Sequence, residues 1–213
     1  MNSTLFIIFG LIGLGIIGLI WRLSSQRHTL PCPSWLGWMV EMDNPFTEVN
    51  RARVIVGLLE LAPAMKVLDA GCGPGRLTLP LAEAVGPKGE VTALDIQEGM
   101  LARVREKVQA AGLQNVEFMQ AGLGEGKLFH TYYDRVVLVT VLGEIPDQAG
   151  ALKEIYAVLK PGGILSVTEV IFDPHFQRRE PVTRLAQAAG FKEKAFYGRS
   201  LAYTMHFEKP LLV

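Results

Sequence analysis

Cysteine is scarce in this sequence, and no spacing of residues suits a metal ion. The chain has two cysteines among 213 residues, Cys32 and Cys72, too few for the disulfide framework of small secreted domains. It contains no CxxC, HExxH or His-x-His motif, and its four histidines are scattered. We therefore expect no bound metal, and the sequence favours a small buried loop residue over a reactive thiol at Cys72.

An excess of charge of one sign is also missing. The 21 lysines and arginines equal the 21 aspartates and glutamates. This balance argues against a nucleic-acid-binding protein, since such binding depends on a surplus of positive charge. Hydrophobic residues make up 49% of the chain, which excludes a disordered protein. The length suits one ordinary domain with an appendage, and the composition leaves the oligomeric state open.

The first part of the chain is rich in apolar residues. Residues 5–21 (LFIIFGLIGLGIIGLIW) contain no charge, and as a helix they would reach about 26 Å, close to the roughly 30 Å of a bilayer core. No basic residue precedes them, which disfavours a cleaved signal peptide. We predict that residues 1–30 form a transmembrane anchor. Because Arg22 and Arg27 follow the run, the amino terminus should lie outside and the rest of the chain in the cytoplasm.

Residues 31–46 predict an interfacial amphipathic segment. Two prolines make its start extended, and Trp35 and Trp38 then fall on one side of a helix. Tryptophans just past a membrane span suit the headgroup layer of the membrane lipid bilayer. The same stripe could instead pack on the following domain as a lid. Both interpretations stay open, and Trp38 is a candidate substrate contact.

Residues 47–213 have the pattern of an alternating α/β domain. Residues 47–61 predict an amphipathic helix. Strands are expected at residues 66–70, 91–96, 116–120, 135–141, 164–171, 192–197 and 202–208, and helices at 78–85, 100–111, 148–159 and 181–189.

The order of these elements predicts a doubly wound, Rossmann-like sheet of seven mostly parallel strands, with ligands at the carboxyl ends of the strands. The run VVLVTV is apolar at nearly every position, as in a parallel strand covered on both faces. The link at residues 198–200 is too short for a crossover helix, so the last two strands should form an antiparallel hairpin. The predicted fold class is α/β, preceded by one transmembrane helix.

A glycine-rich turn, residues 69–75 (DAGCGPG), joins the first strand to a helix. Its glycines let backbone N–H groups approach a ligand closely. A dinucleotide fingerprint would place its third glycine at position 76, where Arg76 stands. Asp95 ends the second strand about 20 residues later, where a carboxylate can accept both hydroxyls of a ribose. Together these features predict a cofactor with a nucleoside but no pyrophosphate.

With these features, roughly residues 45–213 resemble the class I S-adenosylmethionine-dependent methyltransferases. The resemblance rests on five blocks: DAGCGPG, ALDIQEGML, DRVVLVTVLGEIPD, LKPGG and the hairpin closing on FEKP. It implies S-adenosyl-L-methionine as the cofactor. It also implies these contacts: Asp69, Gly71, Gly73 and Gly75 at the methionine portion, the carbonyl of Thr140 at its ammonium, Asp95 at the ribose and Ile96 against the adenine.

One position departs from this pattern. Many relatives carry an aspartate after the third strand that accepts the adenine exocyclic N–H, whereas this chain has Gly122, followed by Leu123. We therefore expect backbone groups at this point, or the side chain of Gln120, to hold the adenine; otherwise the cofactor binds more weakly.

Candidate catalytic residues lie at the carboxyl edge of the predicted sheet. A base is needed only when the methyl acceptor must lose a proton. Glu144, Glu169 and His175 are candidates, and His175 is the first choice because a histidine side chain titrates near neutrality. Alternatively, Asp173 and Pro174 begin a turn that His175 caps. The arginines Arg178 and Arg179 could clasp a phosphate head or form a solvated helix start.

An anchored enzyme is expected to act on a small lipophilic methyl acceptor in the membrane, because attachment raises its local concentration. A phospholipid amine headgroup and a quinone-like ring both qualify; a lipophilic thiol or another small molecule is the alternative. The blocks EVIFDPHFQRRE and LAQAAGF resemble small membrane-associated methyltransferases related to the phospholipid and quinone enzymes. A nonenzymatic anchored scaffold is the rival hypothesis: Gly122 favours it, while the glycine turn and Asp95 argue against it.

Overall fold

The computed structural model describes residues 13, 41, 47–128 and 132–211. The predicted anchor and interfacial segment, including Trp38, therefore lie outside the described residues apart from two isolated positions. Within the described part of the chain, no helix is long and apolar enough to cross a membrane.

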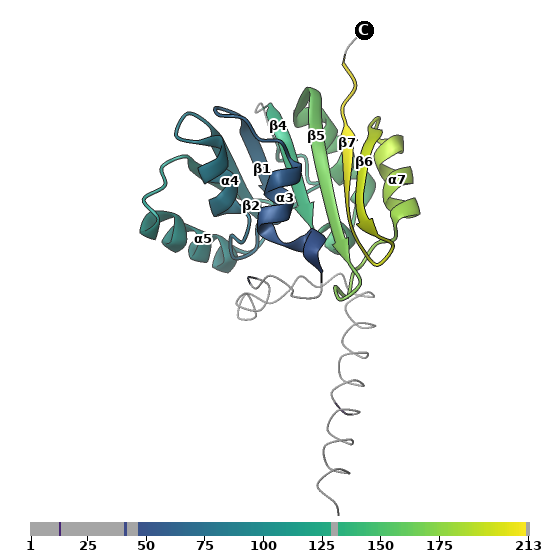
Figure 1. Ribbon diagram of the computed structural model, residues 1–213, viewed down its shortest axis with the longest axis horizontal. Helices are drawn as coiled ribbons and strands as arrows, with labels where there is room; N and C mark the ends of the chain where they lie inside the picture. Colours follow the sequence, from purple (N-terminus) through teal and green to yellow (C-terminus); the bar gives the residue numbers. More distant parts are fainter. Residues whose placement is uncertain (1–12, 14–40, 42–46, 129–131, 212–213) are drawn as a thin grey trace, which may run out of the picture.

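One mixed sheet forms the centre of the domain (Figure 1). Its seven strands are β1 (Lys66–Ala70), β2 (Glu90–Asp95), β3 (Val116–Gln120), β4 (Tyr133–Val139), β5 (Leu159–Val170), β6 (Lys192–Arg199) and β7 (Ala202–Glu208). Their spatial order is β3-β2-β1-β4-β5-β7-β6, and β7 runs antiparallel to both of its neighbours. The predicted α/β sheet with a terminal antiparallel hairpin is confirmed.

Helices cover both faces of this sheet. They are α3 (Ala52–Leu58), α4 (Thr78–Val85), α5 (Glu98–Ala110), α6 (Gln148–Val158) and α7 (Arg179–Ala188), with short 3-10 helices η2 (Glu48–Asn50) and η3 (Leu142–Glu144). Alternate side chains of the strands point to opposite faces. Val67 and Val137 pack in the core under α3 and α4, whereas Leu68 and Val136 pack in the core under α6 and α7. Burial on both faces explains why these strands are apolar at nearly every position.

The prediction of a single helix over residues 47–61 is wrong. η2 ends at Asn50, Arg51 is extended (φ −70°, ψ 136°), and α3 begins only at the next residue. The carbonyl and side-chain oxygens of Asn50 accept hydrogen bonds from the Arg76 guanidinium at 2.6 and 3.0 Å. This long-range contact holds Asn50 in a buried position and sets the break in the helix.

Four strands, β2, β4, β5 and β6, have limits that differ from the prediction, and β4 and β5 are the two that bear on the site. β4 ends at Val139 because Thr140 has a φ of +55°, which turns the chain out of the extended conformation. β5 begins at Leu159 and runs through the LKPGG segment, where Leu159 pairs with Tyr133. Because β4 and β5 are parallel neighbours, these boundaries bring η3 and the end of β5 to the same edge of the sheet.

Candidate active site

The glycine turn after β1 leaves open space at one position. Gly71, Gly73 and Gly75 have φ values of +73°, +51° and +86°, which favour glycine. A Cβ at Gly71 would lie 2.5 Å from Val141 Cγ2, and one at Gly75 would lie 3.1 Å from the Val104 side chain. A Cβ at Gly73 would meet nothing within 4 Å. Gly71 and Gly75 therefore serve close packing, whereas Gly73 borders space that a ligand can use.

Asp95, at the end of β2, is tied to this turn. Its Oδ2 accepts a hydrogen bond from the Gly73 N–H at 2.9 Å, and its Oδ1 accepts one from the Gln97 N–H at 2.8 Å. Burial raises the pKa of the Asp95 carboxyl, while these N–H donors oppose the rise. A carboxylate offers about four acceptor sites, more than the backbone N–H groups of Gly73, Ile96 and Gln97 use, so it can still accept from a ribose hydroxyl.

Asp69 has a different environment from Asp95. It is buried, and its Oδ2 accepts a hydrogen bond from the Thr78 hydroxyl at 2.7 Å. Burial raises its pKa to about 6, against the opposing effects of Thr78 and Arg76. The structure thus makes Asp69 a link between β1 and the start of α4. That link fixes the shape of the glycine turn beside the predicted methionine portion.

Ile96 and Thr140 lie at the same edge of the sheet. Ile96 directly follows β2 and its side chain is 55% exposed, which leaves an apolar surface for a flat base. Its carbonyl accepts a hydrogen bond from Gln120 Nε2 at 3.3 Å. Thr140 follows β4 with a positive φ, and its N–H donates to the Thr168 carbonyl at 2.9 Å. A positive φ at a non-glycine residue is uncommon and clusters at functional sites.

The carboxylate of Glu125 lies close to Gly122, at the place that a Cβ atom of residue 122 would take. A Cβ at Gly122 would be 2.5 Å from Glu125 Oε1, and the Gly122 N–H donates to Glu125 Oε2 at 3.4 Å. The ion pair with Lys127, at 2.6 Å, lowers the pKa of Glu125 and keeps it charged. Glu125 thus stands near the position at which many relatives carry an aspartate.

Glu125 is not among the residues predicted for the site, because the chain must turn back at Gly124 and Gly126 to bring it there. Both glycines have positive φ, and the GLGEG spacing is the signal that could have revealed the turn. The side chain of Leu123 is buried in the core beneath α6. Leu123 can therefore contribute to an adenine site through its backbone, as the sequence analysis allowed.

The predicted catalytic pair comes together beside β5. His175 is 5% exposed, and its Nδ1 lies 3.6 Å from Glu144 Oε1 and 3.9 Å from Asp173 Oδ1. These distances exceed those of good hydrogen bonds but allow electrostatic pairing. Any side chain at Gly143 would clash with the His175 carbonyl, so a glycine there permits the close approach.

The segment after β5 also forms the turn that was the alternative prediction for Asp173 and His175. The Asp173 N–H donates to the Val170 carbonyl at 2.9 Å, and Asp173 Oδ1 accepts from the His175 N–H at 2.7 Å. The turn therefore does not exclude a chemical role, because it is what carries His175 to Glu144.

Arg178 and Arg179 lie at the start of α7. Arg178 is exposed and precedes the first residue of the helix. Arg179 forms an ion pair with Glu193 at 2.7 Å and lies 4.4 Å from the centre of the Phe196 ring. This geometry matches a solvated helix start, and Arg179 is directed toward β6 rather than toward the glycine turn.

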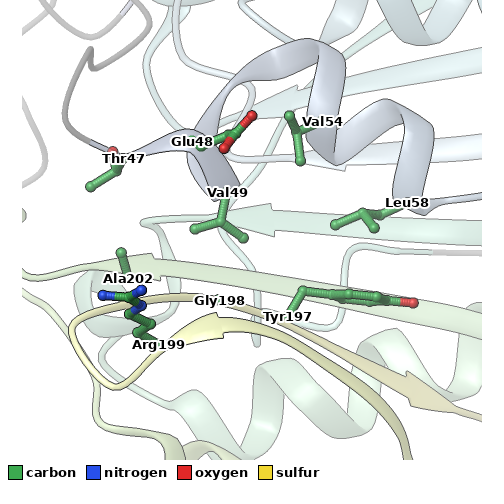
Figure 2. Close-up of a pocket in the computed structure, with 9 residues that line it drawn as sticks. All are labelled: Thr47, Glu48, Val49, Val54, Leu58, Tyr197, Gly198, Arg199 and Ala202. Carbon is green, nitrogen blue, oxygen red and sulfur yellow. The ribbon is translucent and has the colours of Figure 1, made fainter.

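A separate groove of about 520 Å³ lies between the η2–α3 segment and the β6–β7 hairpin (Figure 2). Its lining is Thr47, Glu48, Val49, Val54, Leu58, Tyr197, Gly198, Arg199 and Ala202. None of these residues belongs to the glycine turn, so the groove is distinct from the cofactor position.

Among the described residues, no group of three or more histidine, cysteine, aspartate or glutamate side chains is arranged to hold a metal ion. Cys72 is 6% exposed, and burial raises the pKa of its thiol. Its interpretation as a buried loop residue is confirmed.

Comparison with known families identifies the class of protein. The family model described as "Methyltransferase domain" matches residues 61–204. The chain belongs to this methyltransferase family. A crystal structure of a SAM-dependent methyltransferase from Aquifex aeolicus has a TM-score of 0.75, covering 84% of this chain and all of that one, at 22% identity. This likeness concerns the fold. The predicted enzyme class is confirmed by the family match, and with it the cofactor S-adenosylmethionine.

The site of this methyltransferase fits its cofactor. Gly73 borders open space, Asp95 has acceptor capacity left, and the Ile96 side chain is exposed beside them. When bound, S-adenosylmethionine supplies an electrophilic methyl group on sulfur. Gly73 and Asp95 would hold the cofactor, and Ile96 would cover its base.

Two curated relatives are demethylmenaquinone methyltransferases. The methyltransferase is 42% identical to the Bacillus cytotoxicus protein over 106 residues, which is 50% of this chain and 45% of that one. It is 33% identical to the Listeria welshimeri protein over 153 residues, which is 67% of this chain and 65% of that one. The matches thus span less than two thirds of these relatives.

Proposed function

We propose that this methyltransferase transfers a methyl group from S-adenosylmethionine to a ring carbon of a reduced, quinone-like acceptor that resides in the membrane. The similarity to demethylmenaquinone methyltransferases is the observation that carries the acceptor class. In this reaction the ring carbon gains the methyl group, and the ring loses one proton overall. No oxidant or reductant is consumed.

Removal of this proton requires a base, and the position of His175 beside Glu144 supports His175 in that role. A phenolic ring becomes a stronger carbon nucleophile when its hydroxyl proton is removed. His175 can take that proton, and the nearby Glu144 carboxylate, at 3.6 Å, stabilises the imidazolium that results. The remaining acceleration comes from holding the ring carbon in line with the methyl group.

Apolar surface at the same edge supports a lipophilic acceptor. Phe172 and Leu201 are 64% and 55% exposed. They lie close together, because the Ile171 N–H donates to the Leu201 carbonyl at 2.8 Å. Large exposed apolar side chains near a site suit contact with a lipid. The apolar run at residues 5–21 supports a single-pass anchor, with the methyltransferase domain in the cytoplasm and Trp38 at the headgroup layer.

The test is a labelling experiment with the detergent-solubilised full chain. The protein is incubated with S-adenosylmethionine labelled in its methyl group, together with a membrane lipid extract or a reduced short-chain naphthoquinone. Mass spectrometry should locate the label on a ring carbon. Label on a phospholipid amine or on a thiol would contradict the proposal in favour of those acceptors, and cofactor binding without any transfer would favour a scaffold. Asp95→Ala serves as the control without a complete ribose site.

The membrane part of the proposal has its own test. Removing residues 1–30 should abolish methylation of an acceptor embedded in vesicles, while methylation of a water-soluble analogue continues. Unchanged activity toward the embedded acceptor would contradict an anchoring role for this segment.

A further inference from the structure

A buried carboxyl group lies at the end of β5 with one oxygen unused. Glu169 is the penultimate residue of β5 and is 1% exposed. Its Oε2 accepts a hydrogen bond from the Gln177 N–H at 3.0 Å. Its Oε1 is buried and has no hydrogen-bond partner among the described residues. Buried polar atoms are almost always paired, so such an atom calls for an explanation, and a ligand is one.

The surroundings of Glu169 favour its protonated form. Burial raises its pKa to about 8, and the negative charges of Asp173 and Glu144 add to this effect. Among the described residues, the titratable groups around it are Glu144 on η3, Asp173 and His175 on the loop after β5, Tyr203 on β7 and, acting on Tyr203, Glu180 on α7. An undissociated carboxyl group has one O–H donor. Since Oε2 is used as an acceptor, Oε1 carries that donor.

A network of hydrogen bonds surrounds the Glu169 carboxyl group. Tyr203 lies opposite Glu169 in the β5–β7 register, and its hydroxyl donates to the Gln177 carbonyl at 2.7 Å. Gln177 Nε2 in turn donates to the His175 carbonyl at 3.0 Å. One network therefore positions both Glu169 and His175 relative to each other.

We propose that Glu169 is an acceptor-binding residue whose Oε1 hydroxyl donates a hydrogen bond to an oxygen of the acceptor ring. The inference rests on the proposed function, because a ring oxygen is the partner it names. Glu169 holds one ring oxygen, while His175 removes the proton of a ring hydroxyl.

The location of Glu169 fits this role. β5 lies beside β4 in the sheet, and the Thr140 N–H donates to the carbonyl of Thr168, the residue before Glu169. Glu169 therefore lies at the edge where Thr140 is expected to meet the methionine portion of the cofactor. An acceptor held by Glu169 would be adjacent to the transferable methyl group.

Two substitutions test the proposal in the full-length protein. Glu169→Gln keeps an oxygen for the Gln177 N–H and places an amide donor where Oε1 stands. Glu169→Ala removes both groups. We measure kcat and KM for a soluble reduced naphthoquinone between pH 6 and 9.5, and the dissociation constant of S-adenosylmethionine by calorimetry.

We expect the wild-type KM for the acceptor to rise as the pH passes about 8, because the ionised carboxyl group cannot donate. Glu169→Gln should have a KM near the wild-type value at pH 7 and lack this alkaline rise. Glu169→Ala should raise the KM about tenfold, as for the loss of one hydrogen bond, without a change in cofactor affinity. A merely structural role would not remove the alkaline rise in the glutamine variant.

Ser166→Ala is the matched control, since Ser166 is also buried on β5 with an unpartnered Oγ among the described residues. It should keep the wild-type pH profile. An alkaline rise that persists in Glu169→Gln overturns the proposal, and so does a loss of kcat at every pH with an unchanged KM, which would indicate a base. If the wild type binds the cofactor but methylates no quinone-like ring, the proposed function itself fails, and this inference fails with it.

Discussion

The backbone N–H of Gly73 donates a hydrogen bond of 2.9 Å to Oδ2 of Asp95. This bond joins the glycine turn after β1 to the end of β2, so the two parts of the cofactor site have a fixed relation before any ligand binds. A site organised in advance loses less entropy on binding. Substitutions of either residue should therefore affect cofactor affinity before they affect the chemistry.

Asp95→Ala should weaken S-adenosylmethionine binding by about 1–3 kcal/mol, because ribose hydroxyls would lose their acceptor and the Gly73 N–H would lose its partner. Calorimetry with the purified protein measures the effect. Glu98→Ala is the control, since Glu98 begins α5 nearby and forms an ion pair with the exposed Arg105. An unchanged dissociation constant in Asp95→Ala would refute the ribose assignment.

Gly73→Ala should reduce cofactor affinity far more than its backbone strain explains. Gly112→Ala is the matched control, because Gly112 has a φ of +68° and a Cβ there would also meet nothing within 4 Å. Each alanine should cost about 1 kcal/mol of folding free energy, measured by urea denaturation. Only the Gly73 variant should lose S-adenosylmethionine binding by calorimetry; equal affinities in both variants would show that the space beside Gly73 is not the cofactor position.

Glu125 should take the place of the missing aspartate at the adenine. Glu125→Ala is expected to raise the dissociation constant of S-adenosylhomocysteine about tenfold, as for one lost charge-assisted hydrogen bond. S-inosylhomocysteine, whose base lacks the exocyclic amine, should bind the wild type weakly. Its dissociation constant should differ less between the wild type and the variant. Glu117→Ala, an exposed glutamate on β3, is the control. If the ratio of the two dissociation constants is the same for the wild type and Glu125→Ala, the assignment is contradicted.

His175→Ala should lower kcat about 100-fold or more while leaving cofactor affinity unchanged, because a general base acts after binding. Single-turnover assays with the soluble quinol analogue measure the step directly. His206→Gln, which alters a second buried histidine on β7, should keep the wild-type rate. Wild-type turnover in His175→Ala would remove this residue as the base.

His206 should make the folded protein sensitive to acid. Burial, together with the nearby Arg135 charge, lowers its pKa to about 4 from an ordinary value of 6.5. The folded state therefore disfavours the charged form, so stability is fully present above pH 6.5 and falls as the pH drops toward 4. The loss should approach about 3 kcal/mol.

Urea titrations at pH 7, 5.5 and 4 measure this loss. It should be absent from His206→Gln and present in Ser166→Ala, which changes the residue paired with His206 in the β5–β7 register. If the free energy of unfolding falls equally with pH in the wild type and in His206→Gln, His206 is not the cause of the acid sensitivity.

Periodicity and turn residues predicted much of the fold. β1, β3 and β7 have the expected limits. The helix predicted for residues 47–61 failed, since its break depends on Arg76, which is distant in sequence from Asn50. A local pattern contains no information about such a contact.

The sequence by itself determined the order of strands and helices, the glycine turn and the acid after β2, and hence the class of cofactor. These features depend on residues close together in the chain, whose backbone preferences act locally. Only the tertiary structure decided that Asn50 is buried against Arg76 and that Glu169 shares a buried network with His175. Burial, and with it the ionisation of a side chain, depends on which distant segments cover it.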